Sequence, residues 1–365
     1  MIYYMWRSID LLYAIAYCMP GGSVHFVKTE IYNYLHNIDY SLLRYCHEEV
    51  RIYTKRKKNL HEYCLYMGNL LHRMLGVFML IEVKNLSKRF ADNEAVKSLN
   101  LSFEKGVYGL LGANGAGKTT FMKMLCRILT PSSGSIFLDN SNIKDLGERY
   151  YDLLGYLPQD HCYYPDFTAR EYLTYIALIK GIDKKIIKKR IQEVLDIVSL
   201  SNAIDKKVKT YSGGMKRRLG IAQAIINNPL ILILDEPTAG LDPKERIRFR
   251  NLLSKLSHDR IVILSTHIVS DIESIANKIL IMKEGNIILN DCKENILRKI
   301  DNYVWICRIS YEDSEIMQEK YIVSNIKSYS DGVELRIITD KKPHETAEKI
   351  LPTLEDLYMF NLTKK

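Results

Sequence analysis

Short apolar runs alternate with longer segments of helical periodicity through the middle of the chain. The runs lie at residues 107–111, 153–157, 230–234 and 261–266. Runs of this kind are typical of strands that are buried on both faces in a parallel sheet. Helical patterns lie between them, at residues 118–126, 169–200 and 219–226. This alternation predicts an α/β core with its functional site at the carboxyl ends of the strands.

The segment before and around the first apolar run has a different pattern. Shorter strands of an antiparallel sheet are predicted at residues 80–83, 99–103 and 135–138. Lys88, Arg89 and Phe90 are expected in the turn between the first two of these strands, and residues 131–134 in the turn before the third.

The pattern changes again beyond residue 290. Alternation of apolar and polar side chains predicts strands at residues 303–309, 321–329 and 333–338. Residues 346–351 have a helical pattern. We therefore expect a small α+β appendage, and we find no catalytic signature in it.

One glycine-rich loop joins the run at residues 107–111 to the helix that begins near Lys118. Its sequence is Gly112-Ala113-Asn114-Gly115-Ala116-Gly117-Lys118-Thr119-Thr120, which has the spacing of a P-loop in the expected strand–loop–helix context. Its glycines permit unusual backbone angles and remove Cβ atoms that would keep backbone N–H groups away from phosphate. The helix directs its positive dipole end at the phosphates. Lys118 is expected to contact the β- and γ-phosphates, and Thr119 to bind Mg²⁺.

Two carboxylates follow the apolar run at residues 230–234. Asp235 comes directly after the run, and Glu236 is the next residue. Beside a P-loop, Asp235 is expected to hold Mg²⁺ directly or through water. Glu236 is expected to orient and polarise the attacking water. A structural alternative is an acidic strand end that caps the next turn, and the presence of the P-loop argues against it.

Composition gives limited information about the number of domains, the cellular compartment and any association with a membrane. The chain has 365 residues, enough for two or three domains, and a mild net charge of +9. Seven cysteines are scattered without Cys-x-x-Cys spacing, which predicts reduced thiols in a cytosolic protein. No apolar run approaches the length that crosses a bilayer. If the protein works at a membrane, another subunit is expected to span it.

Six motifs in a fixed order resemble the ATP-binding cassette (ABC) family, and most closely the ATPase subunits of bacterial drug and antibiotic exporters. They are the P-loop, Gln159, Ser212-Gly213-Gly214, Asp235-Glu236-Pro237-Thr238, Gly240-Leu241-Asp242-Pro243 and Ser265-Thr266-His267. The resemblance covers residues 80–290 and is weaker in the tail, where residues 352–358 look like the closing segment of these ATPases. Tyr211, Met215 and Ala113 differ from the residues that are usual in the family, but the Ser-Gly-Gly core is intact.

The resemblance implies a role for each motif. Gln159 would contact Mg²⁺ and the attacking water, and His267 would hydrogen-bond the γ-phosphate. Phe90 would stack on the adenine of ATP, although an aromatic residue that merely covers the sheet edge is an equal alternative. The segment Ser212-Gly213-Gly214, at a helix N-terminus, would bind the γ-phosphate of ATP that a second subunit holds.

These roles imply partner subunits. Each chain carries one P-loop and one Ser-Gly-Gly signature, so a competent enzyme needs two cassettes, in a homodimer or in a heterodimer with a sister subunit. An integral-membrane permease is also implied, in contact with residues 159–171, where Tyr163, Tyr164 and Phe167 are candidate exposed aromatics. The protein would then lie in the cytoplasm, on the inner face of the cell membrane.

The alternative function is a soluble ABC ATPase that acts on ribosomes or nucleic acid. The ribosomal type usually carries two cassettes in a chain, and this chain has one. The type that acts on chromosomes inserts a long coiled coil, whereas only about 90 residues separate the P-loop from the signature here. We therefore expect export rather than a nucleic-acid partner.

The resemblance implies an α/β P-loop NTPase fold with three parts. Residues 79–290 would form the ATPase domain, with an antiparallel β subdomain and a helical subdomain at about residues 160–215. Residues 291–365 would form the appendage.

Residues 1–78 are atypical of the rest of the chain. They show coarse helix patterns at residues 9–19 and 25–50. Their cysteines and histidines (Cys46, His47, His61 and Cys64) match no structural zinc spacing. The codons of residues 75–78 can contain AGGAG a few nucleotides before the Met79 codon. Our hypothesis is that translation normally starts at Met79, so that residues 1–78 are either not part of the native protein or a dispensable extension.

Overall fold

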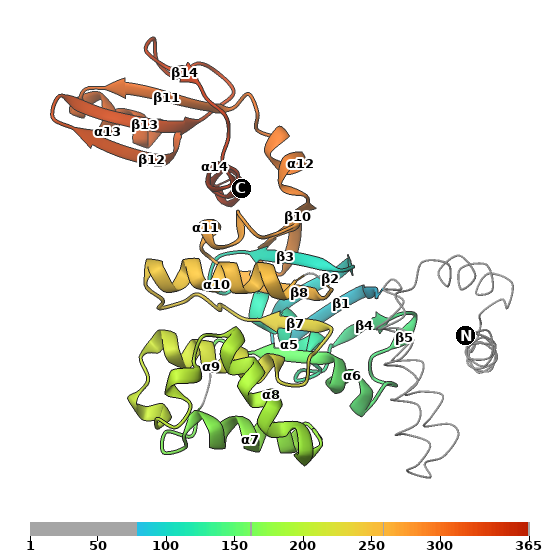
Figure 1. Cartoon of the computed structure of the whole chain (residues 1–365). Helices are drawn as coiled ribbons and strands as arrows, with labels where there is room; N and C mark the ends of the chain where they lie inside the picture. The colour runs from blue at the N-terminus through green and yellow to red at the C-terminus, as the bar shows by residue number, and fades with distance from the viewer. Residues whose placement is uncertain (1–78, 161–162, 258, 364–365) are drawn as a thin grey trace, which may run out of the picture. The chain divides into compact units, whose positions relative to one another are not determined.

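The structure is a computed structural model that describes residues 79–160, 163–257 and 259–363 (Figure 1). The chain divides into two units, Met1–Phe78 and Met79–Lys365. The predictions made for residues 1–78, namely the two helices, the absence of a zinc site and a start at Met79, lie outside the described residues. All six motifs belong to the second unit.

A six-stranded sheet forms the centre of the second unit, in the order β10-β9-β3-β8-β7-β6. Its members are β3 (Gly106–Leu111), β6 (Leu154–Leu157), β7 (Ile231–Leu234), β8 (Ile261–Thr266), β9 (Lys278–Lys283) and β10 (Asn286–Asp291). Neighbours from β9 to β6 pair in parallel, and β10 runs antiparallel to β9. Every residue of β7 and β8 is buried. The parallel α/β core that the unbroken apolar runs predict is confirmed.

A second, antiparallel sheet has the order β2-β1-β4-β5. Its strands are β1 (Ile81–Phe90), β2 (Asn93–Phe103), β4 (Ser133–Leu138) and β5 (Ser141–Asn142). The placement of Lys88, Arg89 and Phe90 in a turn was wrong, because their backbones stay in register with β2. The turn falls instead at Ala91 and Asp92. Exposed polar side chains gave the end of this strand the appearance of a turn.

A helical layer follows β6 along the chain. It contains α7 (Ala169–Ile179), α8 (Lys184–Ile197), the single turns η1 (Ser201–Ala203) and η2 (Val208–Thr210), and α9 (Gly213–Ile225). The helical stretch predicted from residue 169 is therefore two helices. Gly181 takes a left-handed φ of 69°, and Asp183 then caps α8 by accepting a bond from the N–H of Lys185 at 2.9 Å. Figure 1 shows this layer on one side of the central sheet.

Four further helices lie beside the strands. They are α5 (Lys118–Leu125), directly after the P-loop, α6 (Glu148–Leu153), α10 (Pro243–Leu256) and α11 (Val269–Ile272). α10 begins with a capping aspartate, Asp242, followed by proline, which is the preferred order at a helix start. α11 is a single turn that begins two residues after His267.

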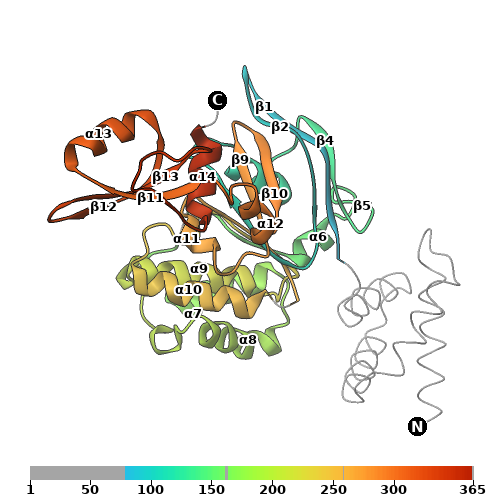
Figure 2. The same cartoon turned by 90° about the horizontal axis from the view of Figure 1, so that it is seen from above.

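The tail forms a third sheet in the order β12-β13-β11-β14, and Figure 2 shows β12, β13 and β11 together with α13. Its strands are β11 (Val304–Ile309), β12 (Ile322–Tyr329), β13 (Gly332–Ile338) and β14 (Glu348–Lys349), with α12 (Lys293–Arg298), α13 (Tyr311–Lys320) and α14 (Leu354–Thr363) around them. The three predicted strands are present. The helix predicted at residues 346–351 was wrong: β14 pairs there with β11, and Pro352 delays the helix until Leu354.

The last helix, α14, packs back onto the ATPase core. Leu354, Leu357 and Tyr358 belong to the same buried cluster as Ile272 of α11 and Ile296 of α12. At the other end of α14, the Lys283 ammonium donates to the carbonyl oxygen of Leu362 at 3.0 Å. The positive charge of the lysine thus lies at the C-terminus of the helix, where the helix dipole is negative. The first turns of α14 therefore pack into the hydrophobic core of the central sheet.

A buried carboxylate joins α14 to the third sheet. Asp356 is fully buried, and its oxygens accept bonds from Arg336 Nε and Nη2 at 2.7–2.9 Å and from Thr353 N at 2.7 Å. Burial raises the pKa of the Asp356 carboxyl, but the bonds from Arg336, Ser324 and Thr353 outweigh burial, so the pKa lies below its ordinary value. The ionised Asp356 carboxylate stabilises the fold fully above about pH 4, the ordinary pKa of aspartate. This stabilisation is lost as the pH falls through the lowered pKa of the folded state.

We expect Asp356→Ala to reduce the free energy of unfolding by about 3–5 kcal/mol at pH 7, because it leaves Arg336 without its buried partner. Urea unfolding followed by circular dichroism measures the loss. Lys327→Ala is the matched control, since it removes an exposed pair with Glu334 at 3.1 Å and should cost about 1 kcal/mol or less. The difference between Asp356→Ala and the wild type should shrink below about pH 4. Equal losses for the two variants at pH 7 would contradict this account.

Candidate functional site

The P-loop surrounds the ammonium group of Lys118 at the start of α5. The Nζ atom donates to the carbonyl oxygens of Gly112 at 2.7 Å and Ala113 at 3.1 Å. Gly117 precedes the helix with a left-handed φ of 106°, and a Cβ there would lie 2.3 Å from the carbonyl oxygen of Ala95. Only glycine lets the loop make this turn while lying against β2.

A serine of β8 organises the two carboxylates that follow β7. The Ser265 hydroxyl donates to Asp235 Oδ1 at 2.6 Å and accepts from the N–H of Glu236 at 2.9 Å. One hydroxyl thus orients the first carboxylate and holds the backbone of the second. The parallel register of β7 and β8 brings these residues to the same edge of the sheet.

Glu236 lies at a sharp bend in the backbone. Its φ of 47° is left-handed, which is uncommon for a residue with a Cβ. Its Oε2 lies 3.0 Å from His267 Nδ1, and its Oε1 lies 3.7 Å from Lys118 Nζ. The structure therefore brings Lys118, Asp235, Glu236 and His267 together, and we call these four residues the strand-end cluster.

The strand-end cluster carries buried charge. Lys118, Asp235 and Glu236 are all buried, while the His267 side chain is 46% exposed. Burial lowers the pKa of the Lys118 ammonium, and the charges of Glu236 and Asp235 oppose that shift. Two carboxylates and one ammonium therefore share this buried space, where a charge without a partner is unfavourable.

The donor set fits a magnesium ion that a nucleotide completes. Asp235 Oδ2 and Glu236 Oε1 are buried and have no hydrogen-bond partner in the described structure. Among the described residues, no group of three or more histidine, cysteine or acidic side chains could hold a metal by itself. Mg²⁺ in nucleotide enzymes commonly uses one or two carboxylates together with phosphate oxygens and water.

Three other predicted residues lie around the cluster. Thr119 and Thr120 are half-buried in the first turn of α5. Gln159 follows β6, the strand next to β7, and is exposed. The described structure shows no hydrogen bond from the side chain of any of the three, so their predicted contacts with Mg²⁺ and phosphate stay predictions.

Phe90 lies at the end of β1, in the hairpin with β2. Its ring is 46% exposed, and the Lys88 ammonium lies 5.1 Å from the ring centroid. Ala95, further along the same hairpin, lies against Gly117 of the P-loop. The ring is therefore an accessible aromatic surface near the phosphate loop, and its contact with adenine stays a prediction.

The segment Ser212-Gly213-Gly214 is not joined to the strand-end cluster. The Ser212 hydroxyl accepts from the N–H of Met215 at 3.2 Å and caps α9. Ser212 and Gly213 are exposed. Among the described residues, no hydrogen bond or ion pair links the segment to the cluster. The N-terminus of α9 is thus open to a ligand from outside the chain.

Two residues of the site were not predicted in their present roles. The sequence identifies Ser265 only as part of the motif that contains His267. A polar residue at the end of an otherwise apolar buried strand could, however, have indicated that its side chain has a hydrogen-bonding role in the site. Arg217 was not predicted at all. It is buried in α9, and its guanidinium donates to the carbonyl oxygens of Asp235 and Pro237 at 2.8 Å.

A phosphate loop at the start of a helix, with two carboxylates at a neighbouring strand end, defines this fold and site as those of a P-loop nucleoside triphosphatase. The ABC transporter family profile matches residues 96–239. The uncharacterized ABC transporter ATP-binding protein YxlF of Bacillus subtilis is 37% identical over 68% of this chain and 82% of its own length. The bacitracin transport ATP-binding protein BcrA of Enterococcus faecalis is 40% identical over 59% of this chain and 70% of its own.

Solved structures agree with this family. The dimeric structure of MJ0796, a bacterial ABC transporter cassette, matches with a TM-score of 0.54 and 26% identity, over 58% of this chain and 98% of that one. The chain belongs to the ATP-binding proteins of the ABC transporter family. It binds ATP and is the ATPase subunit of such a transporter. In the described part of the chain, no helix is both long and apolar enough to cross a membrane.

We expect Ser265→Ala to lower kcat by about tenfold or more, because Asp235 and the backbone of Glu236 lose their shared partner. Steady-state phosphate release at saturating ATP and Mg²⁺ measures the effect. Ser257→Ala is a suitable control, since Ser257 is a half-buried serine at the far end of α10 whose hydroxyl donates, among the described residues, to Ser254 O at 3.0 Å. A Ser265→Ala enzyme with wild-type kcat would show that the hydroxyl is not needed for the geometry of the carboxylates.

Proposed function

We propose that this ATPase drives export through a separate membrane permease and that the strand-end cluster carries out hydrolysis. The observation that carries the proposal is the meeting of Lys118, Asp235, Glu236 and His267 beside the P-loop. The bacitracin transport relative supports an antibiotic-exporter type of transporter. The permease would decide which substrate is moved.

Each residue of the cluster has a distinct task. Lys118, held by two loop carbonyls, places its charge where the β- and γ-phosphates lie over the loop. Glu236 accepts hydrogen bonds from the attacking water and polarises it. His267, partly exposed and 3.0 Å from Glu236, donates to the γ-phosphate and fixes the glutamate side chain. The P-loop backbone from Gly112 to Thr120 surrounds the phosphates with N–H groups.

Asp235, Thr119 and Gln159 are the residues that would hold Mg²⁺. The ion supplies charge neutralisation at the β- and γ-phosphate oxygens. The unpaired Oδ2 of Asp235 supports this assignment. Phe90 provides the surface for the adenine ring.

A second cassette completes each ATP site in this proposal. The open N-terminus of α9, with Ser212-Gly213-Gly214, contacts the γ-phosphate of ATP bound to the partner. The similarity to a dimeric bacterial cassette supports this arrangement. The partner is a second copy of this chain or a sister subunit.

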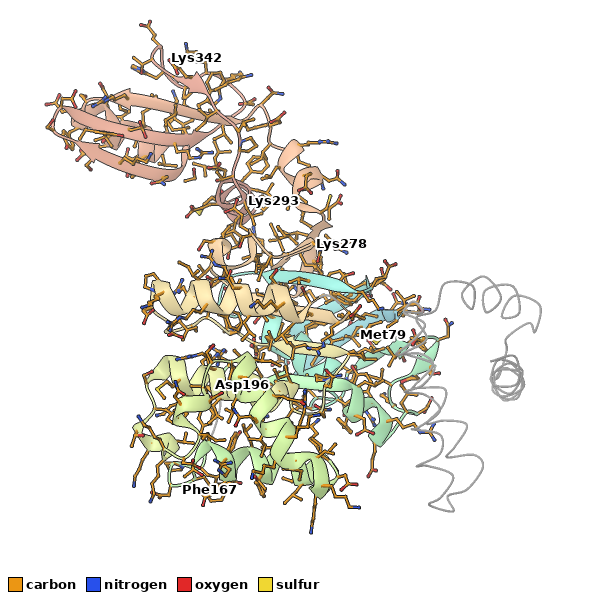
Figure 3. All side chains as sticks on the ribbon, viewed as in Figure 1. Met79, Phe167, Asp196, Lys278, Lys293 and Lys342 are labelled. Atoms are coloured by element: carbon orange, nitrogen blue, oxygen red, sulfur yellow. The ribbon has the colours of Figure 1, made fainter. Side chains whose placement is uncertain are left out.

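The permease contact is an exposed apolar surface of the helical layer, which we call the α7 stripe. It consists of Tyr164, Phe167, Tyr175, Leu178 and Ile179. The rings of Tyr164 and Phe167 stack at a centroid distance of 5.0 Å, and Figure 3 labels Phe167 on the side of the layer away from the central sheet. Tyr163 is not part of the stripe, because it is turned inward and its hydroxyl donates to Lys216 O. In this proposal the protein lies in the cytoplasm, held on the inner face of the cell membrane by the permease.

Lys118→Ala should reduce ATP turnover to background, because the phosphates lose their central cation. Phosphate release by the purified chain is the measurement. Lys123→Ala is the control, since Lys123 is an exposed lysine on the same helix. Retained turnover in Lys118→Ala would mean that this loop is not the phosphate site.

Glu236→Gln should bind ATP without hydrolysing it and so accumulate a dimer that holds two nucleotides. Light scattering behind a size-exclusion column, with and without ATP and Mg²⁺, measures the dimer. A chain that binds ATP and stays monomeric under these conditions would contradict the trans role of Ser212-Gly213-Gly214.

Tyr175→Ser combined with Leu178→Ser should leave the ATPase activity of the isolated chain within about twofold of wild type, because the stripe lies outside the nucleotide site. The same double variant should abolish co-purification with the permease, because it removes apolar side chains of the proposed contact. The assay tags the wild-type chain, identifies the multispanning protein that co-purifies from detergent-solubilised membranes, and repeats the capture with the variant. Ile316→Ser, on the exposed face of α13, is the control. Undiminished capture by the double variant would remove the stripe from the contact.

A further inference from the structure

The guanidinium of Arg217 donates to backbone carbonyl oxygens, and these are its hydrogen-bond partners among the described residues. Arg217 lies in the second turn of α9 and is 9% exposed. It donates to the carbonyl oxygens of Pro158, Gln159, Asp235, Glu236 and Pro237, at distances that include 3.1 Å for Gln159 and 2.8 Å for Asp235 and Pro237. In the described part of the chain, no carboxylate forms an ion pair with it. The planar guanidinium has five N–H donors in a fixed arrangement, so it can reach several carbonyl oxygens at once. The compact ammonium group of a lysine is less suited to such a set of acceptors.

These five oxygens come from two places that matter for catalysis. Pro158 and Gln159 form the segment after β6, which carries the predicted Mg²⁺ ligand. The other three form the bend that turns the Glu236 side chain toward Lys118 and His267. Ser265 holds this bend from the N–H side, and Arg217 holds it from the carbonyl side.

Burial makes the contact costly to lose. Burial lowers the pKa of the Arg217 guanidinium, and the nearby groups of Tyr163, Asp235 and Glu236 oppose that shift. A buried cation that lost its acceptors would carry the full penalty of desolvation. The helix, the bend and the Gln159 segment therefore have a strong preference to move together.

We propose that Arg217 is a positioning residue that couples the N-terminus of α9 to the catalytic carboxylate of the same chain. Ser212-Gly213-Gly214 and Arg217 lie on consecutive turns of one helix, so displacement of the helix start displaces the guanidinium. Contact of α9 with the partner's ATP thereby sets the position of Glu236 and Gln159 toward the chain's own ATP. This inference rests on the proposed trans role of the signature segment.

A second arginine, which contacts the other end of α9 from a neighbouring helix, provides a control. Arg190 of α8 donates to the carbonyl oxygens of Ile225 and Ile226, both at 2.8 Å, at the opposite end of α9. Like Arg217 it donates to backbone carbonyl oxygens, and it also pairs with the Glu193 carboxylate at 3.0 Å, but it reaches no residue of the site. Arg190→Gln therefore shows how much kcat and Kd change when α9 loses a contact with α8 while the backbone contacts of Glu236 remain.

The experiment compares Arg217→Lys, Arg217→Gln and Arg190→Gln in the full chain. Phosphate release gives kcat, and calorimetric titration with ATP and Mg²⁺ in a Glu236→Gln background gives Kd. We expect both Arg217 variants to lose about 100-fold in kcat, with Arg217→Lys the less affected, and to change Kd by less than about threefold because the P-loop contacts remain. Arg190→Gln should change neither by more than about threefold.

Coupling also predicts cooperativity. The rate of the wild type should rise with ATP concentration with a Hill coefficient above about 1, and Arg217→Lys should lower the coefficient toward about 1.

A folded Arg217→Lys chain with the kcat of the wild type overturns the proposal, and so does a parallel loss of kcat in the Arg217 and Arg190 variants. A non-cooperative wild type also overturns it. If Arg217→Gln does not fold, Arg217→Lys decides the question. Failure of Glu236→Gln to dimerise with ATP would instead overturn the proposed function itself.

Discussion

The burial of four charged side chains at one edge of the parallel sheet is the constraint on which the site depends. Lys118, Arg217, Asp235 and Glu236 are all less than 10% exposed, and an unpaired charge in such surroundings is strongly unfavourable. The two cations are satisfied by backbone carbonyls. The two carboxylates are satisfied only in part, by Ser265 and His267. Asp235 Oδ2 and Glu236 Oε1 have no hydrogen-bond partner in the described structure, and Oε1 faces the Lys118 ammonium at 3.7 Å.

The sequence predicts this site well where the chemistry is local. The P-loop, the two carboxylates and His267 each stand next to the strand that positions them, so spacing along the chain is enough to locate them. The buried strands β7 and β8 were predicted to within one residue for the same reason, because burial on both faces leaves an unbroken apolar run. Parallel pairing then brings their ends to one edge.

Prediction from sequence failed where contacts with another segment, rather than local composition, decide the structure. Lys88, Arg89 and Phe90 have the composition of a turn, but their register with β2 keeps them in a strand. Residues 348–349 have a helical pattern and pair with β11 instead. Arg217 binds carbonyl oxygens 18 and 58 positions away along the chain. Carbonyl oxygens are common to every residue, so no pattern in the sequence marks them as its partners.

The left-handed bend at Glu236 shows why several elements must converge on the site. A backbone in this region costs about 1–3 kcal/mol and persists only where its surroundings determine it. β8 contacts the bend through Ser265, and α9 contacts it through Arg217. The segment just after the bend is held by α11, where the Thr238 hydroxyl donates to the buried Asp271.

α11 in turn packs against α14, the last helix of the appendage, in one hydrophobic cluster. Asp356 and Arg336 tie that helix to the third sheet. A chain of packed contacts therefore runs from the appendage to within two residues of Glu236. The appendage is therefore joined to the catalytic bend by continuous packing and hydrogen bonding, through α14, α11 and Thr238.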